Sequence, residues 1–196
     1  LSALSFDPQP TTPAQEARAT TSKTIRFMTQ EVRRTTRGFL CVVSNCGPMQ
    51  RVAIVGCGFM GRMHANVYRL LENATLAAVV DHRLERAEKF GEEFGVPSFT
   101  TLEEAAGFVD VIDICLPTYV HREFTERAAK AEKHVFCEKP MALTVADAGA
   151  MQAVCNSAGV RLMVGHCIRF WPEYALLKKL VDNALLGRLL SINLTR

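Results

Sequence analysis

The chain has 196 residues, of which 48% are hydrophobic and 22% charged, a composition typical of globular proteins that excludes a collagen-like or wholly disordered chain. Its 23 lysines and arginines against 20 aspartates and glutamates leave a net charge of +3. So small a surplus gives no indication of nucleic-acid binding, which needs a clustered basic face. No run of about 18 apolar residues occurs, so we expect no membrane-spanning segment.

The seven cysteines form an odd set that contains no C-x-x-C pair. Such a set favours reduced thiols over a disulfide framework or a zinc site. We therefore predict no metal site and a reducing, cytoplasmic location.

Residues 1–48 differ in composition from the rest of the chain. Residues 1–50 hold 12 serines and threonines, 4 of the 8 prolines and only 3 acidic residues. We expect 1–48 to be disordered or a non-native extension, with Met49 as a natural start. Import into an organelle is the weaker alternative, because no clear amphipathic helix accompanies the Arg, Ser and Thr bias.

From residue 51 onward, short apolar runs alternate with amphipathic stretches. Buried strands are expected over 52–55, 76–80, 111–116, 134–137 and 161–164, with at best a short edge strand over 95–100. Helices are expected over 59–71, 84–94, 120–131, 145–158 and 172–183. This alternation predicts an α/β fold with a doubly wound parallel sheet.

The end of the chain predicts a further strand. Residues 189–196 alternate like a strand and then stop, which suggests truncation. We expect residues 49–165 to form one domain and residues 166–196 to be the truncated start of a second, α+β domain.

A glycine-rich segment joins the first predicted strand to the first helix. Its candidate cofactor-binding residues are Gly56, Gly58, Phe59, Met60 and Gly61. In the spacing G-x-G-x-x-G, Gly56 permits a tight turn, Gly58 lets a diphosphate approach the backbone, and Gly61 lets helix and strand pack closely. The anion would lie on the free N–H groups of the helix N-terminus. A plain strand-to-helix turn is the alternative for the glycines alone.

The second predicted strand ends at Asp81, 20 residues after Gly61. A carboxylate there accepts hydrogen bonds from the adenosine ribose and repels a 2′-phosphate, which favours NAD over NADP. Arg83 leaves NADP open, since its guanidinium suits either adenine stacking or a 2′-phosphate. The alternative for Arg83 is a solvated residue in the first turn of a helix.

Two loops after neighbouring strands carry further candidates. The loop after the fourth strand includes Leu116, Pro117, Thr118 and His121, and the fifth strand runs into Glu138-Lys139-Pro140. Ligands of open parallel sheets lie beyond the carboxyl ends of the strands. A charged pair there is costly unless paired or solvated. A surface ion pair is the alternative, and a cis bond before Pro140 would aim Lys139 into the cleft.

Lys139 is the candidate catalytic residue. Its ammonium group can donate hydrogen bonds to a carboxamide or a substrate hydroxyl. Partial desolvation would let it share a proton near the working pH.

These motifs, taken in order, resemble the glucose-fructose oxidoreductase and inositol 2-dehydrogenase family (Gfo/Idh/MocA). The resemblance covers residues 49–196 and rests on the glycine loop, on Asp81, on residues 116–121 and on Glu138-Lys-Pro-Met-Ala-Leu-Thr144. It implies a Rossmann domain for NAD(P), followed by a domain with a large, mainly antiparallel sheet. It also implies oxidation or reduction of a hydroxyl-bearing carbon on a sugar, polyol or related small molecule, and a homo-oligomeric full-length protein.

The resemblance also implies roles for single residues. Lys139 matches the lysine that touches nicotinamide and substrate, Glu138 the residue that orients the ribose, and Pro117 and Thr118 the loop beside the cofactor. The family's Asp-x-x-x-His helix, which carries the base, does not occur in residues 165–196. Catalysis would therefore need sequence beyond Arg196, and we expect this piece alone to be inactive.

Histidines and residues 166–174 complete the set of candidates. Arg169 and His166 are candidates for the substrate side, because a guanidinium suits a carboxylate or several hydroxyls. Phe170, Trp171 and Tyr174 are expected in the core. His64, one turn after Gly61, is expected at a helix cap or on the surface.

Three functions are consistent with these residues. The first is an NAD(P)-dependent oxidoreductase, here as an incomplete chain with its nucleotide-binding domain. The second is a non-catalytic NAD(P)-binding regulator or sensor. The third is a methyltransferase, since S-adenosylmethionine enzymes also use a glycine-rich loop and an acidic residue after the second strand.

Overall fold

The computed structural model describes residues 48–193. The strands are β1 (Gln50–Val55), β2 (Ala74–Val80), β3 (Ser98–Phe99), β4 (Val111–Ile114), β5 (His134–Cys137) and β6 (Leu162–Val164). The helices are α2 (Phe59–Tyr68), α3 (Leu84–Phe94), α4 (Leu102–Ala106), α5 (His121–Lys130), α6 (Val145–Ser157) and α7 (Pro172–Asp182). Two 3₁₀ helices are η1 (Thr118–Val120) and η2 (Cys167–Phe170). The predictions for residues 1–47 and 194–196 lie outside the described residues.

The strands form one parallel sheet with the order β3-β2-β1-β4-β5-β6. This is the strand order of the Rossmann fold, and the predicted doubly wound sheet is confirmed. The order reverses between β1 and β4, whose carboxyl ends therefore flank the crevice in which ligands of such sheets bind.

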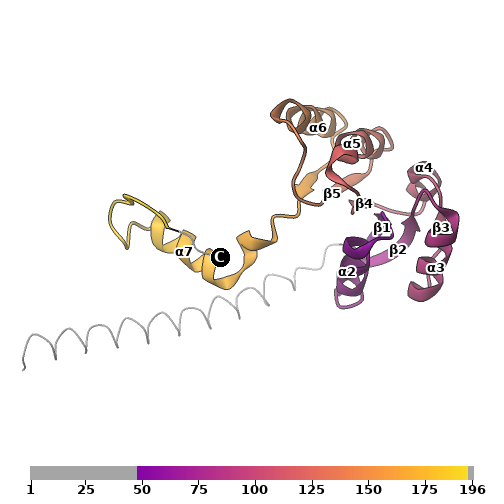
Figure 1. The fold of residues 1–196 in the computed structure, drawn as a ribbon, viewed down its shortest axis with the longest axis horizontal. Helices are drawn as coiled ribbons and strands as arrows, with labels where there is room; N and C mark the ends of the chain where they lie inside the picture. The colour runs from indigo at the N-terminus through magenta and orange to yellow at the C-terminus, as the bar shows by residue number, and fades with distance from the viewer. Residues whose placement is uncertain (1–47, 194–196) are drawn as a thin grey trace, which may run out of the picture. The chain divides into compact units, whose positions relative to one another are not determined.

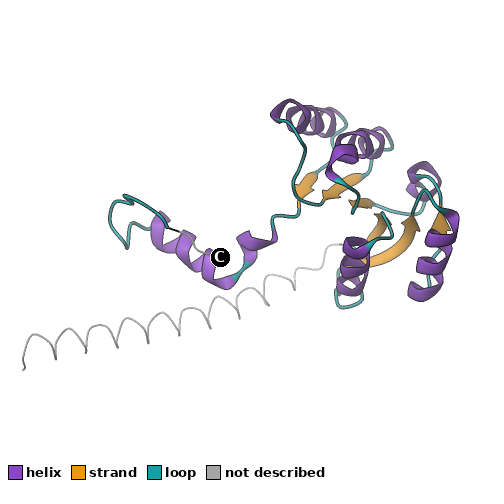
Figure 2. Cartoon of the chain, in the orientation of Figure 1, coloured by secondary structure: helices purple, strands orange, loops and turns teal. Residues whose placement is uncertain are grey.

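Helices cover both faces of the sheet, as Figures 1 and 2 show. Successive side chains of a strand point to opposite faces, so Ala53 and Val55 belong to one core and Ile54 to the other. The first core includes buried residues of α4, α5 and α6, and the second is closed by Ala65 of α2 and Phe90 of α3. Helices α5 and α6 lie side by side in the first layer.

The predicted strands and helices are confirmed with small changes at their ends. Helix α2 ends at Tyr68, three residues early, and β4 ends at Ile114 instead of 116. Helix α4 was missed because it has only five residues. Its start does carry a signal, since the Glu104 carboxylate accepts the N–H of Thr101 at 3.0 Å in the manner of a capping box.

The chain divides into two compact units, of which one covers Cys46–Ile168 and the other includes Arg169 onward. In the second unit, α7 begins with Pro172 at its first turn, as predicted. The strand predicted over 189–196 is wrong for residues 189–193, which are irregular. A strand needs a partner for its backbone, and none within residues 48–193 pairs with this segment.

Three aromatic residues differ from prediction. Phe170, Trp171 and Tyr174 were expected in the core but are 55%, 47% and 40% exposed. Trp171 and Tyr174 contact each other edge to face, with ring centroids 6.2 Å apart. No helix within residues 48–193 is long and apolar enough to cross a membrane.

Candidate functional site

The glycine loop has the backbone geometry that its sequence predicts. Gly56 has a φ of +108°, and a Cβ added there would lie 2.8 Å from the Cys115 carbonyl oxygen. A Cβ at Gly61 would collide with the Gly56 carbonyl oxygen. Gly58, at the N-cap of α2, has open space where its Cβ would be. Two glycines are therefore required by packing, while Gly58 leaves the helix N-terminus open on its outer side.

A cavity of about 690 Å³ opens beside this loop, within the usual range for small-molecule sites. Seven of the predicted cofactor residues line it, namely Gly56, Gly58, Phe59, Met60, Asp81, Leu116 and Pro117. The cavity thus spans the carboxyl ends of β1, β2 and β4, the strands that surround the reversal of strand order.

Asp81 is held in place by the backbone around it. It is only 4% exposed; its Oδ2 accepts the Cys57 N–H at 3.1 Å, and its Oδ1 accepts the Arg83 N–H at 3.0 Å. Burial, aided by the Asp81 charge, raises the pKa of the Cys57 thiol to about 12, so this cysteine stays protonated. Asp81 is therefore a fixed acceptor at the cavity wall.

Arg86 is the cation beside Asp81, and it is not among the residues that the sequence predicts for the site. Its Nη1 lies 3.4 Å from Asp81 Oδ2, and it lines the cavity, whereas Arg83 does not. Arg83 contributes its backbone N–H at the N-cap of α3, and its side chain is exposed. The sequence does carry one signal for Arg86, namely its position in the first turn of the helix that follows Asp81.

The buried His121 ring holds the loop after β4 in place. This side chain is 1% exposed; its Nε2 lies 2.8 Å from the Leu116 carbonyl oxygen and its Nδ1 lies 3.0 Å from that of Pro140. His121 thus links the loops after β4 and β5 and does not line the cavity. Thr118 lines a separate hollow of about 350 Å³ with Tyr119 and Arg122.

The Glu138-Lys139 pair follows β5, one strand farther along the sheet. The Glu138 N–H donates to the Ile114 carbonyl oxygen at 3.0 Å, which places it next to the end of β4. Glu138 Oε2 accepts the Lys139 N–H at 3.1 Å, and the Lys139 side chain is exposed. The predicted cis bond between Lys139 and Pro140 is confirmed. Neither residue lines the 690 Å³ cavity.

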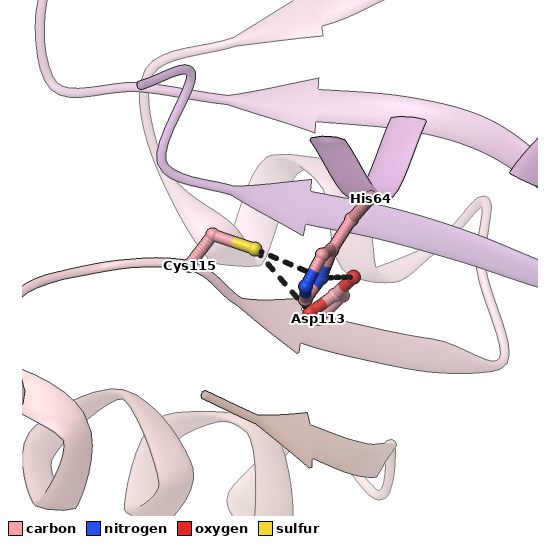
Figure 3. A group of neighbouring side chains, drawn as sticks. All are labelled: His64, Asp113 and Cys115. Carbon is pink, nitrogen blue, oxygen red and sulfur yellow. Dashed lines mark hydrogen bonds and ion pairs between the residues drawn. The ribbon is translucent and has the colours of Figure 1, made fainter. Parts of the chain in front are cut away.

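A buried polar cluster, which we call the His64 cluster, joins α2 to these strand ends. It comprises His64, Tyr68, Asp113, Cys115 and Glu138, and Figure 3 shows three of its members. Asp113 is fully buried; its Oδ2 lies 2.9 Å from both His64 Nδ1 and the Tyr68 hydroxyl, which donates to it. His64 Nε2 lies 3.3 Å from Glu138 Oε1. The expectation of a capping or surface role for His64 is wrong, because its side chain is 16% exposed and paired on both sides.

The cluster shifts the protonation of its members. Burial alone would lower the pKa of His64, but hydrogen bonds and charges from Asp113 and Glu138 outweigh it and raise that pKa. Burial and the Asp113 charge together raise the pKa of both the Cys115 thiol and the Tyr68 hydroxyl far above their usual ranges. The cluster therefore contains a histidine that is readily charged, two carboxylates and two neutral donors.

Three members also offer a possible set of metal ligands. The nitrogen, oxygen and sulfur atoms of His64, Asp113 and Cys115 lie within 4.8 Å of one another. Such mixed donors suit a transition metal. An ion would have to displace the Cys115 proton and the hydrogen bonds to Asp113, so the site as it stands is a hydrogen-bonded cluster.

The candidates for the substrate side lie elsewhere. His166 is exposed and follows Gly165, just after β6. Arg169 is exposed and belongs to the other compact unit. Both remain predictions.

Curated proteins similar to this chain include dehydrogenases of a sugar phosphate and of a polyol. It is 33% identical over 144 residues to glucose-6-phosphate 3-dehydrogenase of Bacillus subtilis and 34% identical over 143 residues to myo-inositol 2-dehydrogenase of Thermotoga maritima. These alignments cover 74% and 70% of this chain but 41% and 42% of the relatives. The chain thus spans about two fifths of the length of the curated relatives it matches.

A solved structure is also similar to this chain. The WlbA dehydrogenase from Bordetella pertussis, in complex with NADH and UDP-GlcNAcA, matches with a TM-score of 0.69 and 29% identity. The match covers 72% of this chain and 41% of that one. Residues 50–166, more than half of the chain, also match a family model, which confirms the resemblance stated from the motifs. The chain belongs to the GFO/IDH/MocA oxidoreductase family, whose matching region is described as an NAD-binding Rossmann fold.

Proposed function

We propose that this chain supplies the NAD(P)-binding part of an oxidoreductase that acts on a CH–OH group of a sugar, polyol or related compound. The observation that carries the proposal is the cavity lined jointly by the glycine loop and Asp81, in a chain of this family. The similarity to dehydrogenases of a sugar phosphate and of myo-inositol supports the substrate class.

The residues of the cavity fit a dinucleotide. Gly58 has no atom within 4 Å of its missing side chain, so a diphosphate can reach the backbone N–H groups at the start of α2. Gly56 and Gly61 hold the turn in the shape that points these groups outward. When bound, the cofactor supplies the hydride chemistry, and the protein supplies position and a path for the proton.

NAD is the expected cofactor, with NADP possible. The buried Asp81 carboxylate would accept hydrogen bonds from the ribose hydroxyls in place of its contacts with Arg86 and His82, whose side chains are 38% and 80% exposed. Its negative charge disfavours a 2′-phosphate. Arg86 is the residue that would reach such a phosphate if Asp81 were neutralised.

Lys139 is the proposed catalytic residue on this chain. Its side chain is exposed beyond the end of β5, beside the strands that reach the cavity. It would orient the substrate hydroxyl and take part in moving its proton. Glu138 fixes the Lys139 backbone N–H and would orient the nicotinamide-side ribose.

Residues 166–196 are proposed as the start of the substrate domain, with His166 and Arg169 on its cofactor side. The whole protein is proposed to be a cytoplasmic homo-oligomer. No observation favours a non-catalytic regulator, because the relatives named above are all dehydrogenases.

Titration of the 196-residue chain with NADH, followed by nicotinamide fluorescence, tests the proposal. We expect saturable binding at one site per chain and a rise in melting temperature with NADH. S-adenosylmethionine should change neither quantity. Stabilisation by S-adenosylmethionine without binding of NADH would favour the methyltransferase interpretation and overturn the proposal.

A further inference from the structure

The His64 cluster connects α2, the helix that follows the glycine loop, to the loop that carries Lys139. Asp113 of β4 has no exposed surface, and a buried carboxylate needs donors around it. The donors are the His64 ring, the Tyr68 hydroxyl and, at 3.5 Å, the Cys115 thiol. The contact of His64 Nδ1 with Asp113 restrains the ring, since the carboxylate is fully buried and has two further donors.

With the ring restrained in this way, its second nitrogen faces Glu138. Nε2 lies 3.3 Å from Glu138 Oε1, so both ring nitrogens face carboxylate oxygens. A ring with a proton on each nitrogen satisfies both contacts. The ring also lies beside Phe136, at 5.7 Å between centroids, which limits its motion on that side.

The Glu138 carboxylate also contacts the backbone of Lys139. While Oε1 faces His64, Oε2 accepts the backbone N–H of Lys139 at 3.1 Å. Gly165 closes the remaining side, because a Cβ there would lie 3.0 Å from Glu138 Oε1. The carboxylate therefore has a single well-defined position between α2, β6 and the loop after β5.

We propose that His64 is a positioning residue that holds Glu138, and through it the Lys139 backbone, in the conformation that receives the nicotinamide half of the dinucleotide. This inference rests on the proposed function. It assigns a role in binding to a helix residue that lines no part of the 690 Å³ cavity.

Two substitutions at His64 separate positioning from a purely structural role. In His64→Asn the amide nitrogen stands near the place of Nδ1 and can still reach Asp113, but it cannot reach Glu138. In His64→Gln the amide nitrogen stands near the place of Nε2 and can reach Glu138. A structural role through Asp113 predicts that Asn is the better replacement, whereas positioning predicts that Gln is.

The experiment titrates the 196-residue chain and both variants with NADH and with ADP, which lacks the nicotinamide half. We expect wild type to bind NADH more tightly than ADP. His64→Asn should weaken NADH about tenfold, the loss typical of one hydrogen bond to a charged group, and leave ADP within about twofold. His64→Gln should restore much of the NADH affinity. His134→Asn is the matched control, because His134 accepts the Arg161 N–H at the opposite end of β5.

ADP binding shows that each variant is folded and keeps its nucleotide cradle. If the ratio of NADH to ADP affinity in His64→Asn equals that of wild type, the positioning role is overturned while the proposed function stays intact. A wild-type chain that binds both ligands equally would overturn it as well, since nothing would remain for His64 to position. A wild-type chain that binds neither ligand would contradict the proposed function itself.

Discussion

The two ends of the proposed dinucleotide site are built in different ways. The adenosine end is built mainly of backbone, namely three glycines and the N-terminus of α2, and of one side chain, Asp81, whose carboxylate accepts hydrogen bonds from backbone N–H groups. The nicotinamide end depends on side chains from α2, β4 and the loop after β5, which meet in the His64 cluster. We therefore expect changes in shape to matter most at the first end, and changes in hydrogen bonding and charge to matter most at the second.

The largest effect is expected at the glycines. Gly61→Ala should lower the free energy of unfolding by about 1–3 kcal/mol or more, because its Cβ meets the Gly56 carbonyl oxygen. Gly58→Ala, the matched control, has space and should stay within about 0.5 kcal/mol of wild type. It should still weaken NADH about tenfold, since its methyl group faces the diphosphate. Equal stability of both variants in urea titrations would contradict this account of the loop.

Asp81→Asn should change the choice of cofactor. It keeps an acceptor for one backbone N–H but loses the charge, so we expect the ratio of NADPH to NADH affinity to rise by about tenfold or more. Fluorescence titrations with both nucleotides measure the ratio. Adding Arg86→Ala should remove the gain in NADPH affinity, and adding Arg83→Ala should not. The opposite result would make Arg83 the residue that meets the 2′-phosphate.

The residues that line the cavity beside the glycine loop could be predicted from the sequence, because each signal lies in or directly after one predicted strand. Their role at the adenosine end of a dinucleotide stays a prediction. Glycine spacing, a following helix and an acidic residue at the end of β2 are read from neighbouring positions, and the cavity brings the same residues together. The contact of Arg86 with Asp81 could not be predicted, because the conformation of the side chain, and not its position in a motif, decides which arginine approaches Asp81.

The nicotinamide end could not be predicted in the same way. His64 appears in the sequence as an ordinary helix residue, and Asp113 as a polar interruption of a buried strand. Only the order of the strands in the sheet brings α2, β4 and the end of β5 together, so that His64 can contact both Asp113 and Glu138. The position of His121 at a helix start near the ligand end of the sheet predicts a place beside the cofactor, whereas its buried ring contacts the Leu116 and Pro140 carbonyl oxygens of two loops.

The nicotinamide end should make stability depend on pH. Because the folded pKa of His64 lies above its ordinary value of 6.5, its stabilisation is complete below that pH and is lost as pH rises through the folded pKa. We expect the difference in free energy of unfolding between wild type and His64→Gln to shrink from pH 6 to about pH 9. Guanidinium titrations of both proteins measure it. A difference that stays constant or grows with pH would exclude a charged His64.

The smallest effect is expected at the opposite end of the sheet, where Arg51 and Asp110 form an exposed pair at 2.7 Å. Hydrogen bonds from Arg51 lower the pKa of Asp110 to about 2. The pair should therefore stabilise the fold above pH 3.8 and lose this effect as pH falls towards 2. Asp110→Asn should cost no more than about 1 kcal/mol at neutral pH, because solvent screens the pair. If Asp110→Asn lowered the free energy of unfolding as much as His64→Gln does, the exposed Arg51–Asp110 pair would stabilise the fold as much as the buried contact of His64 with Asp113.

The central claim is that a nicotinamide dinucleotide binds in the cavity between the glycine loop and Asp81. Amide chemical-shift mapping of the isotope-labelled 196-residue chain during titration with NADH tests it most directly. We expect the largest shifts at the amides of Cys57, Gly58 and Phe59 and next to Asp81, with smaller shifts at Lys139. Shifts confined to other surfaces, or none at saturating NADH, would contradict it.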